Sequence, residues 1–140
     1  MPVEIKELLR ALGDRSRESR YLLDKKTGRV YCVRADDLKN PQVLELIKAR
    51  EKEPARFVEV PKLPAQEIFK DMEAFLKILK NKQLIKKLAG LIGGGGGYRD
   101  FRDALRGYER EEKLWFDFRE QRMKERLKNW LKTVGIRENF

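Results

Sequence analysis

The stretch YLLDKKTGRVYCV, residues 21–33, decides the fold class of this 140-residue chain. Its two ends are short runs of β-prone residues, and between them lies an Asp-Lys-Lys-Thr-Gly segment. Aspartate favours the opening of a turn, and Gly28 supplies the positive φ that closes it. The pattern therefore predicts a β-hairpin. Cys32, the single cysteine, lies in its second strand and is expected to be a small buried hydrophobe.

The segments that flank the hairpin predict further helices and one more strand. Residues 4–12 place four aliphatic side chains on one helical face, and Gly13 ends that helix. Asp36 or Asp37 is expected to cap a second helix, which ends before a proline. The β-prone run at 57–60 indicates a third strand, and a proline closes it.

From Pro64, which fits the first helical position, the sequence is helical in pattern. Apolar residues between 68 and 79 follow a 3.6-residue period, but this phase cannot continue, so a break is required near Asn81. A new helix then runs to a set of glycines, a short helix follows and ends at Gly107, and a long final helix comes last. The following residues of these last two helices are expected to be buried: Phe101, Trp115, Phe116, Met123, Leu127, Trp130 and Val134.

These elements predict an α+β fold, with a small antiparallel sheet (the hairpin plus a third strand) and a helical C-terminal half. The length suits a single domain that spans residues 1–140. Within it we expect a sheet-containing part at 1–61 and a helical part at 62–140.

Composition narrows the classes of function. Of the residues, 41% are hydrophobic and 40% are charged, and the formal net charge of +10 favours polyanionic partners. Without any histidine, the chain lacks the usual general base and the commonest zinc ligand, so we predict no catalytic residue, no metal site and no cofactor. A metal-assisted enzyme that uses carboxylates only, such as Asp100 and Asp103, is kept as an alternative.

Targeting signals and cysteine content indicate the compartment. No run of residues is long and apolar enough to span a bilayer, and the N-terminal sequence lacks the order of a signal peptide. Together with the single cysteine, this predicts a cytoplasmic protein. Glutamine and asparagine are few beside dense lysine, arginine and glutamate, which suggests a thermophilic source as a side hypothesis.

The candidate binding surface begins with a lysine-rich stretch ahead of five consecutive glycines at 93–97. No acidic residue occurs within 74–99, whereas Lys82 and Lys86 are four residues apart on one helical face, with Lys87 adjacent. Like charges at this spacing repel, and a polyanion would offset that repulsion. The alternative is that these lysines form the solvated face of an ordinary amphipathic helix.

The glycine run itself has two interpretations. The exposed N–H groups of a glycine-rich turn ahead of a helix can cradle an anion. Alternatively, the run is a flexible or close-packed connection between two helices. A nucleotide-binding loop is disfavoured, because the run follows a helix and not a strand, and no Lys-Ser or Lys-Thr pair comes after it.

Arginines continue the candidate surface after the glycines, at three- and four-residue spacing. Arginine can fork onto phosphate or stack on bases, and Tyr98 or Tyr108 could offer a stacking face. A local ion pair between Arg99 and Asp103 is the alternative. The residues that we predict to contact nucleic acid are therefore Lys82, Lys86, Lys87, Gly94, Gly95, Gly96, Arg99, Arg102 and Arg106.

Three motifs in order, GGGGYRDFRDAL at 94–105, WFDF at 115–118 and WL at 130–131, resemble the signature of uncharacterised protein family 158. The chain departs from the family pattern at Gly97, Tyr98 and Asp100, where the family prefers alanine, phenylalanine and arginine. With the hairpin upstream, the resemblance spans roughly Tyr21 to Leu131. It implies one α+β domain in a bacterial cytoplasm, and it brings no established activity.

The first functional hypothesis is a non-enzymatic module that binds nucleic acid, RNA or a single strand in preference to a specific duplex site. No recognition-helix motif supports base-specific reading. The alternative is a protein-interaction or regulatory module, whose partner is acidic or packs on the cluster at 115–118. The oligomeric state does not follow from the sequence.

Overall fold

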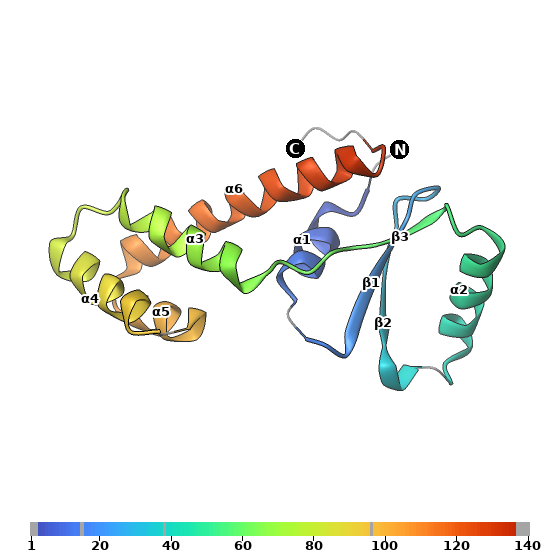
Figure 1. The fold of residues 1–140 in the computed structure, drawn as a ribbon, viewed down its shortest axis with the longest axis horizontal. Coiled ribbons are helices and arrows are strands. Elements are labelled where there is room, and N and C mark those ends of the chain that lie inside the picture. The colour runs from blue at the N-terminus through green and yellow to red at the C-terminus, as the bar shows by residue number, and fades with distance from the viewer. Residues whose placement is uncertain (1–2, 15, 38, 96, 137–140) are drawn as a thin grey trace. The chain divides into compact units, whose positions relative to one another are not determined.

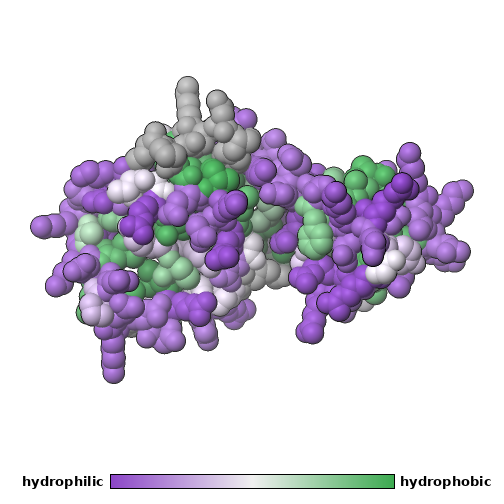
Figure 2. Space-filling view, turned by 180° about the vertical axis from the view of Figure 1, so that it is seen from behind, coloured by the Kyte–Doolittle hydropathy of each residue, from purple (hydrophilic) through white to green (hydrophobic). Residues whose placement is uncertain are grey.

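The computed structural model describes residues 3–14, 16–37, 39–95 and 97–136. The chain divides into two compact units, Met1–Leu63 with Lys124–Phe140, and Pro64–Met123. All three strands belong to the first unit, and helices build the second (Figure 1). The α+β class is thereby confirmed, whereas the single domain stays a prediction. Hydrophilic residues cover most of the face seen in Figure 2, with hydrophobic residues between them.

The first unit is built on a three-stranded antiparallel sheet with the strand order β2–β1–β3. The central strand β1 (Ser19–Asp24) pairs with β2 (Val30–Arg34) on one side and with β3 (Phe57–Glu59) on the other. Gly28 has a φ of 79° in the turn between β1 and β2, as its place in the sequence predicts. The predicted hairpin and the third strand are confirmed.

Helices lie on both sides of this sheet, with α1 (Ile5–Gly13) and α2 (Pro41–Lys52) on opposite sides (Figure 1). Their cover explains why successive residues of β1, on alternating faces, are all buried from Tyr21 to Asp24. The last turns of α6 (Glu109–Thr133) also belong to this unit.

The predicted cap of α2 is wrong. Asp36 and Asp37 lie in a short 3₁₀ helix, η1 (Ala35–Asp37), and Asn40 caps α2 instead. The side chain of Asn40 accepts a hydrogen bond of 2.9 Å from the N–H of Gln42. Pro41 occupies the first helical position, where its fixed φ and missing N–H fit, so the helix begins later than the aspartates suggest.

The second unit consists of α3 (Ala65–Leu76), α4 (Lys82–Gly93), α5 (Tyr98–Leu105) and the first part of α6. The predicted break near Asn81 is confirmed, and Asn81 caps α4 through a hydrogen bond of 3.2 Å from the N–H of Leu84. Pro64 caps α3 and so lies one position before the expected one.

Aromatic rings form the core of the second unit. Phe75, Phe101 and Trp115 are completely buried. The ring centroids of Phe101 and Trp115 are 4.9 Å apart and those of Phe75 and Trp115 are 5.1 Å apart, both edge to face. This geometry suits the aromatic quadrupole. Asp71 is also buried, and it pairs with Arg122 of α6.

Two predictions of burial are wrong, and two others hold only in part, because Trp130 and Val134 are half-buried. Phe116 is 50% exposed, because it lies one position, or about 100°, around the helix from the buried Trp115. The buried face of α6 continues instead through Met123, Leu127 and Leu131. Cys32 is exposed, since β2 is an outer strand of the sheet with partial cover only.

Candidate nucleic-acid interface

The lysines of the candidate interface lie on the solvent face of α4. Leu84 and Leu88 are completely buried and hold the opposite face of the helix against the unit. Lys82 and Lys86 are exposed and lie one helical turn apart, and Lys87 is exposed beside them. The predicted placement of these three side chains outside the core follows from the alternation of leucine and lysine along the helix.

These lysines have no acidic partner within the described residues. Among residues 3–14, 16–37, 39–95 and 97–136, no ion pair involves Lys82, Lys86 or Lys87. The neighbouring Lys77 and Lys80 are likewise exposed and unpaired there. The absence of acidic residues along the sequence is therefore not compensated by acidic residues from elsewhere in the part of the fold that is described.

The glycine run connects α4 to α5. Gly93 is the last residue of α4, and the N–H of Gly94 donates to the carbonyl of Gly90 at 2.9 Å. Gly95 has a φ of 79°, a left-handed conformation that favours glycine at the end of a helix. Gly97 caps α5. Gly96 lies outside the described residues.

Arg99 and Arg102 lie on the exposed side of α5, and Arg106 is exposed directly after the end of the helix. The other side of α5 is buried through Phe101, Ala104 and Leu105. Arg106 pairs with Asp103 at 3.5 Å, so the local ion pair is not the predicted one between Arg99 and Asp103. Arg99 and Arg102 form no ion pair with any described residue. The charge of α5 is thus partly compensated, unlike that of α4.

Sequence reasoning missed a contact at Tyr98. The guanidinium of Arg119, on α6, lies over the Tyr98 ring at 4.8 Å from its centroid. The Tyr98 ring also lies 6.1 Å from that of Trp115, and the Tyr98 hydroxyl is buried. One face of this ring is therefore occupied within the unit, which reduces its use as a stacking platform for bases.

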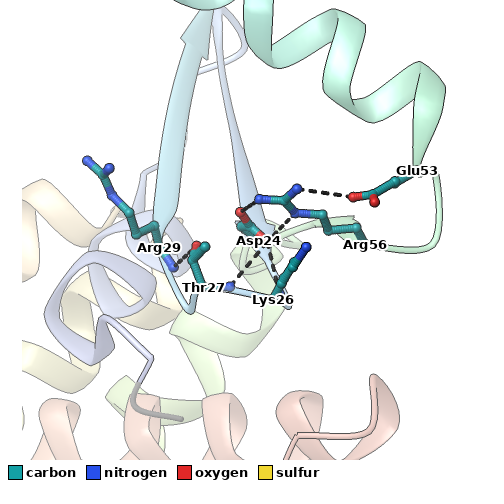
Figure 3. Close-up of polar contacts among 6 residues, drawn as sticks. All are labelled: Asp24, Lys26, Thr27, Arg29, Glu53 and Arg56. Carbon is teal, nitrogen blue, oxygen red and sulfur yellow. Dashed lines mark hydrogen bonds and ion pairs between the residues drawn. The ribbon is translucent and has the colours of Figure 1, made fainter.

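A second polar cluster lies in the first unit, around Asp24 (Figure 3). Asp24 is buried, and its carboxylate accepts hydrogen bonds from Arg56 at 2.9 and 2.7 Å, from Nε and Nη2. Its Oδ1 also accepts from the N–H groups of Lys26, at 2.9 Å, and Thr27, at 3.3 Å. The hydrogen bonds from Arg56 are the main cause that lowers the pKa of Asp24, and the same contact raises the pKa of Arg56.

This cluster borders a pocket of about 540 Å³ between α2 and the sheet. Tyr31 and Phe57 of the strands and Leu46 of α2 contribute to its wall. The carboxylate of Asp24 accepts four hydrogen bonds, three at Oδ1 and one at Oδ2, so its role in the structure is to hold the hairpin turn and Arg56 together. The sequence identifies Asp24 as a turn residue, but the pairing with Arg56 has no local signal.

Two properties of the described residues bear on other classes of function. Among the described residues, no group of three or more histidine, cysteine, aspartate or glutamate side chains is placed to hold a metal ion. Of the helices that the structure describes, none combines the length and the apolar character needed to cross a membrane.

Comparison with known proteins places the chain in a family. No curated protein and no solved structure matches it. A family model matches residues 1–140, the full length of the sequence. The resemblance of the sequence motifs to this family, over roughly residues 21–131, is thereby confirmed and extended to both ends of the sequence. The chain belongs to the Uncharacterised protein family (UPF0158).

Proposed function

We propose that this chain binds nucleic acid, RNA or a single strand, through the exposed face of α4 and the neighbouring arginines of α5. The observation that carries the proposal is that Lys82, Lys86 and Lys87 are exposed and form no ion pair with any described residue. An unpaired exposed cation can neutralise a phosphate, and the release of condensed counterions makes that contact favourable.

Two glycines of α4 support the same surface. Gly90 lies four residues after Lys86, and Gly93 lies three residues after Gly90, so both glycines are on the same face of α4 as Lys86. A Cβ atom added at either position would meet no atom within 4 Å, so packing inside the chain does not require glycine there. Glycine nevertheless destabilises a helix by about 0.5–1 kcal/mol relative to alanine. Bare backbone at these positions allows a phosphate chain to approach the helix closely.

Contacts to phosphate fit this surface better than contacts to bases. Its cations are three lysines and three arginines, and the contacts that either side chain makes to phosphate carry no sequence information. Tyr98, the aromatic side chain at the start of α5, already lies under Arg119. We therefore expect binding that depends weakly on sequence and strongly on salt.

The test compares the double variant Lys82→Gln/Lys86→Gln with the wild type in a titration of labelled single-stranded RNA. We expect the affinity at physiological salt to fall by about tenfold, because two phosphate contacts are lost. Lys48→Gln/Lys52→Gln on α2 is the matched control, with the same charge change at the same four-residue spacing on an exposed helix. We expect this control to bind within about twofold of the wild type.

Three outcomes would contradict the proposal. The first is that the wild type does not bind RNA or DNA even at low salt. The second is that the two double variants lose affinity equally, because the contact would then reflect only net charge. The third is binding that does not respond to salt, which would exclude phosphate contacts as its main source.

An interaction with a protein is the second candidate, and the exposure of two apolar side chains on α6 favours it. Phe116 is 50% exposed and Leu114 is 40% exposed, although both belong to the aromatic start of the helix. Large exposed apolar side chains near a charged surface are typical of protein contacts. Stoichiometric recovery of one protein after nuclease treatment, lost in a Phe116→Ser variant, would favour this candidate over nucleic acid.

A further inference from the structure

The outer edge of strand β2 is closed by two carboxylate side chains. β2 is an edge strand, since the order of the sheet is β2–β1–β3. Yet the N–H of Val30 donates to Oε1 of Glu4 at 2.9 Å, and the N–H of Arg34 donates to Oδ2 of Asp37 at 3.2 Å. Neither Glu4 nor Asp37 lies in a strand of the sheet.

The register of the sheet shows which backbone groups of β2 point outward. In an antiparallel pair, the N–H and C=O groups of successive residues point alternately toward the partner strand and away from it. The N–H groups of Val30 and Arg34 bond to side chains outside the sheet, so Cys32, midway between them, also directs its backbone outward. Tyr21, opposite Cys32, agrees with this, because its carbonyl accepts from the N–H of Val60 at 2.8 Å, on the other side of β1.

Backbone hydrogen bonds hold Glu4 and Asp37 in place at the two ends of β2. The N–H of Glu4 donates to the carbonyl of Gly28 at 3.0 Å, which fixes Glu4 against the end of the hairpin. Asp37 lies in the 3₁₀ helix η1 directly after β2, and the N–H of Ala35 donates to the carbonyl of Glu18 at 3.1 Å. Of the three outward N–H groups of β2, those of Val30 and Arg34 are therefore occupied, and that of Cys32 has no hydrogen-bond partner among the described residues.

An open edge strand is a template on which a further strand can pair, and proteins commonly block it. We infer that Glu4 and Asp37 close the edge of β2 against a second copy of this chain. In an antiparallel pairing of two copies centred on Cys32, Val30 of one copy lies opposite Arg34 of the other. The N–H groups that such a pairing needs at its two ends are those that the carboxylates occupy.

The single cysteine reports on this pairing. Residues directly opposite each other in a hydrogen-bonded antiparallel pair have Cα atoms about 5.5 Å apart, within the range that a disulfide can bridge. Cys32 is exposed and would lie opposite its own copy. Pairing through the edge of β2 would therefore allow a disulfide between two Cys32 residues.

The test is the double variant Glu4→Ala/Asp37→Ala, with light-scattering mass and the rate of disulfide-linked dimer formation under mild oxidation as readouts. We expect both self-association and a rise of at least about tenfold in the rate of Cys32 dimerisation, because unpaired edge N–H groups favour pairing. The control Glu4→Gln/Asp37→Asn keeps an acceptor oxygen at each position, and we expect it to behave as the wild type.

The inference is overturned if the folded double alanine variant neither associates nor dimerises faster than the wild type. It is also overturned if the wild type itself pairs readily through Cys32. A measurement on the wild type does not depend on the folding of a variant. In amide hydrogen exchange, we expect the N–H groups of Val30 and Arg34 to exchange at least about tenfold more slowly than that of Cys32. Equal rates at the three positions would contradict the closure of the edge.

Discussion

The carboxylate of Asp24 closes the hairpin turn and also holds Arg56, which lies 32 residues further along the chain. Arg56 in turn donates to Glu53 at 3.0 Å, and its guanidinium lies 5.0 Å from the centroid of the Phe57 ring. The turn of the hairpin is thereby tied to the start of β3. A buried carboxylate such as that of Asp24 is compatible with a stable fold only while its charged partner is present.

Replacement of Asp24 tests how much its pairing with Arg56 stabilises the fold. We expect Asp24→Asn to lower the free energy of unfolding by about 2 kcal/mol, since it removes the buried charge of an ion pair whose arginine is partly exposed. Urea denaturation followed by circular dichroism measures the loss. Glu53→Gln is the control, because its side chain is 51% exposed and its loss is expected to cost less than about 1 kcal/mol. Equal stability of Asp24→Asn and the wild type would show that the ion pair between Asp24 and Arg56 makes no net contribution to stability.

The lowered pKa of Asp24 also predicts how the stability of the fold changes with pH. The pKa of Asp24 is lower in the folded than in the unfolded chain, chiefly because of Arg56, and the pKa of Asp14 is lowered by the hydrogen bond from Tyr21. A lowered carboxylate pKa stabilises the fold above the unfolded value of about 4, and this stabilisation is lost as the pH falls below it. The Asp24→Asn variant should therefore show a smaller loss of stability than the wild type between about pH 5 and pH 2.

At the scale of the element, α4 and the bend after it contain glycines of two kinds. At Gly90, φ is not positive and an added Cβ would meet no atom within 4 Å. At Gly95 the space is also open, but φ is 79°, a conformation that strains other residues. The backbone conformation therefore requires glycine at position 95 but not at position 90.

Substitution by alanine at the two positions is expected to have opposite effects. Gly90→Ala should raise the free energy of unfolding by about 0.5–1 kcal/mol, because alanine favours the helix and meets nothing. Gly95→Ala should lower it by about 1 kcal/mol, because of its left-handed φ. Thermal melting of both variants measures the difference. A loss of stability in Gly90→Ala would mean that the helix needs glycine there for a reason within the chain.

At the scale of the whole molecule, the net charge of +10 and the number of charges at the interface make different predictions for salt dependence. Five described cations of the interface lack an acidic partner, namely Lys82, Lys86, Lys87, Arg99 and Arg102. At about 0.7 per phosphate contact on a single strand, five contacts give a slope of log K against log salt of about −3.5. A slope near −7 would instead indicate that ten charges act together.

How much of the fold follows from local sequence is clear from the hairpin and from α4. The alternation of β-prone runs around Gly28 is a local signal, and so is the shift of apolar phase at Asn81, which proves to be the cap of α4. The exposure of the candidate lysines likewise agrees with the helical period. Each of these features depends on interactions within a few residues, which is why periodicity and turn chemistry suffice to predict them.

Other features depend on which elements meet, and no local pattern contains them. Cys32 is exposed because β2 became an outer strand, and Phe116 is exposed because α6 buries Trp115 instead. The pairing of Asp24 with Arg56 joins segments far apart in the chain. By itself, the sequence determined the elements, their order and the acid-free cationic stretch, since these are properties of neighbouring residues. Only the tertiary structure decided burial, strand order and long-range pairs, because these arise from contacts between residues distant along the backbone.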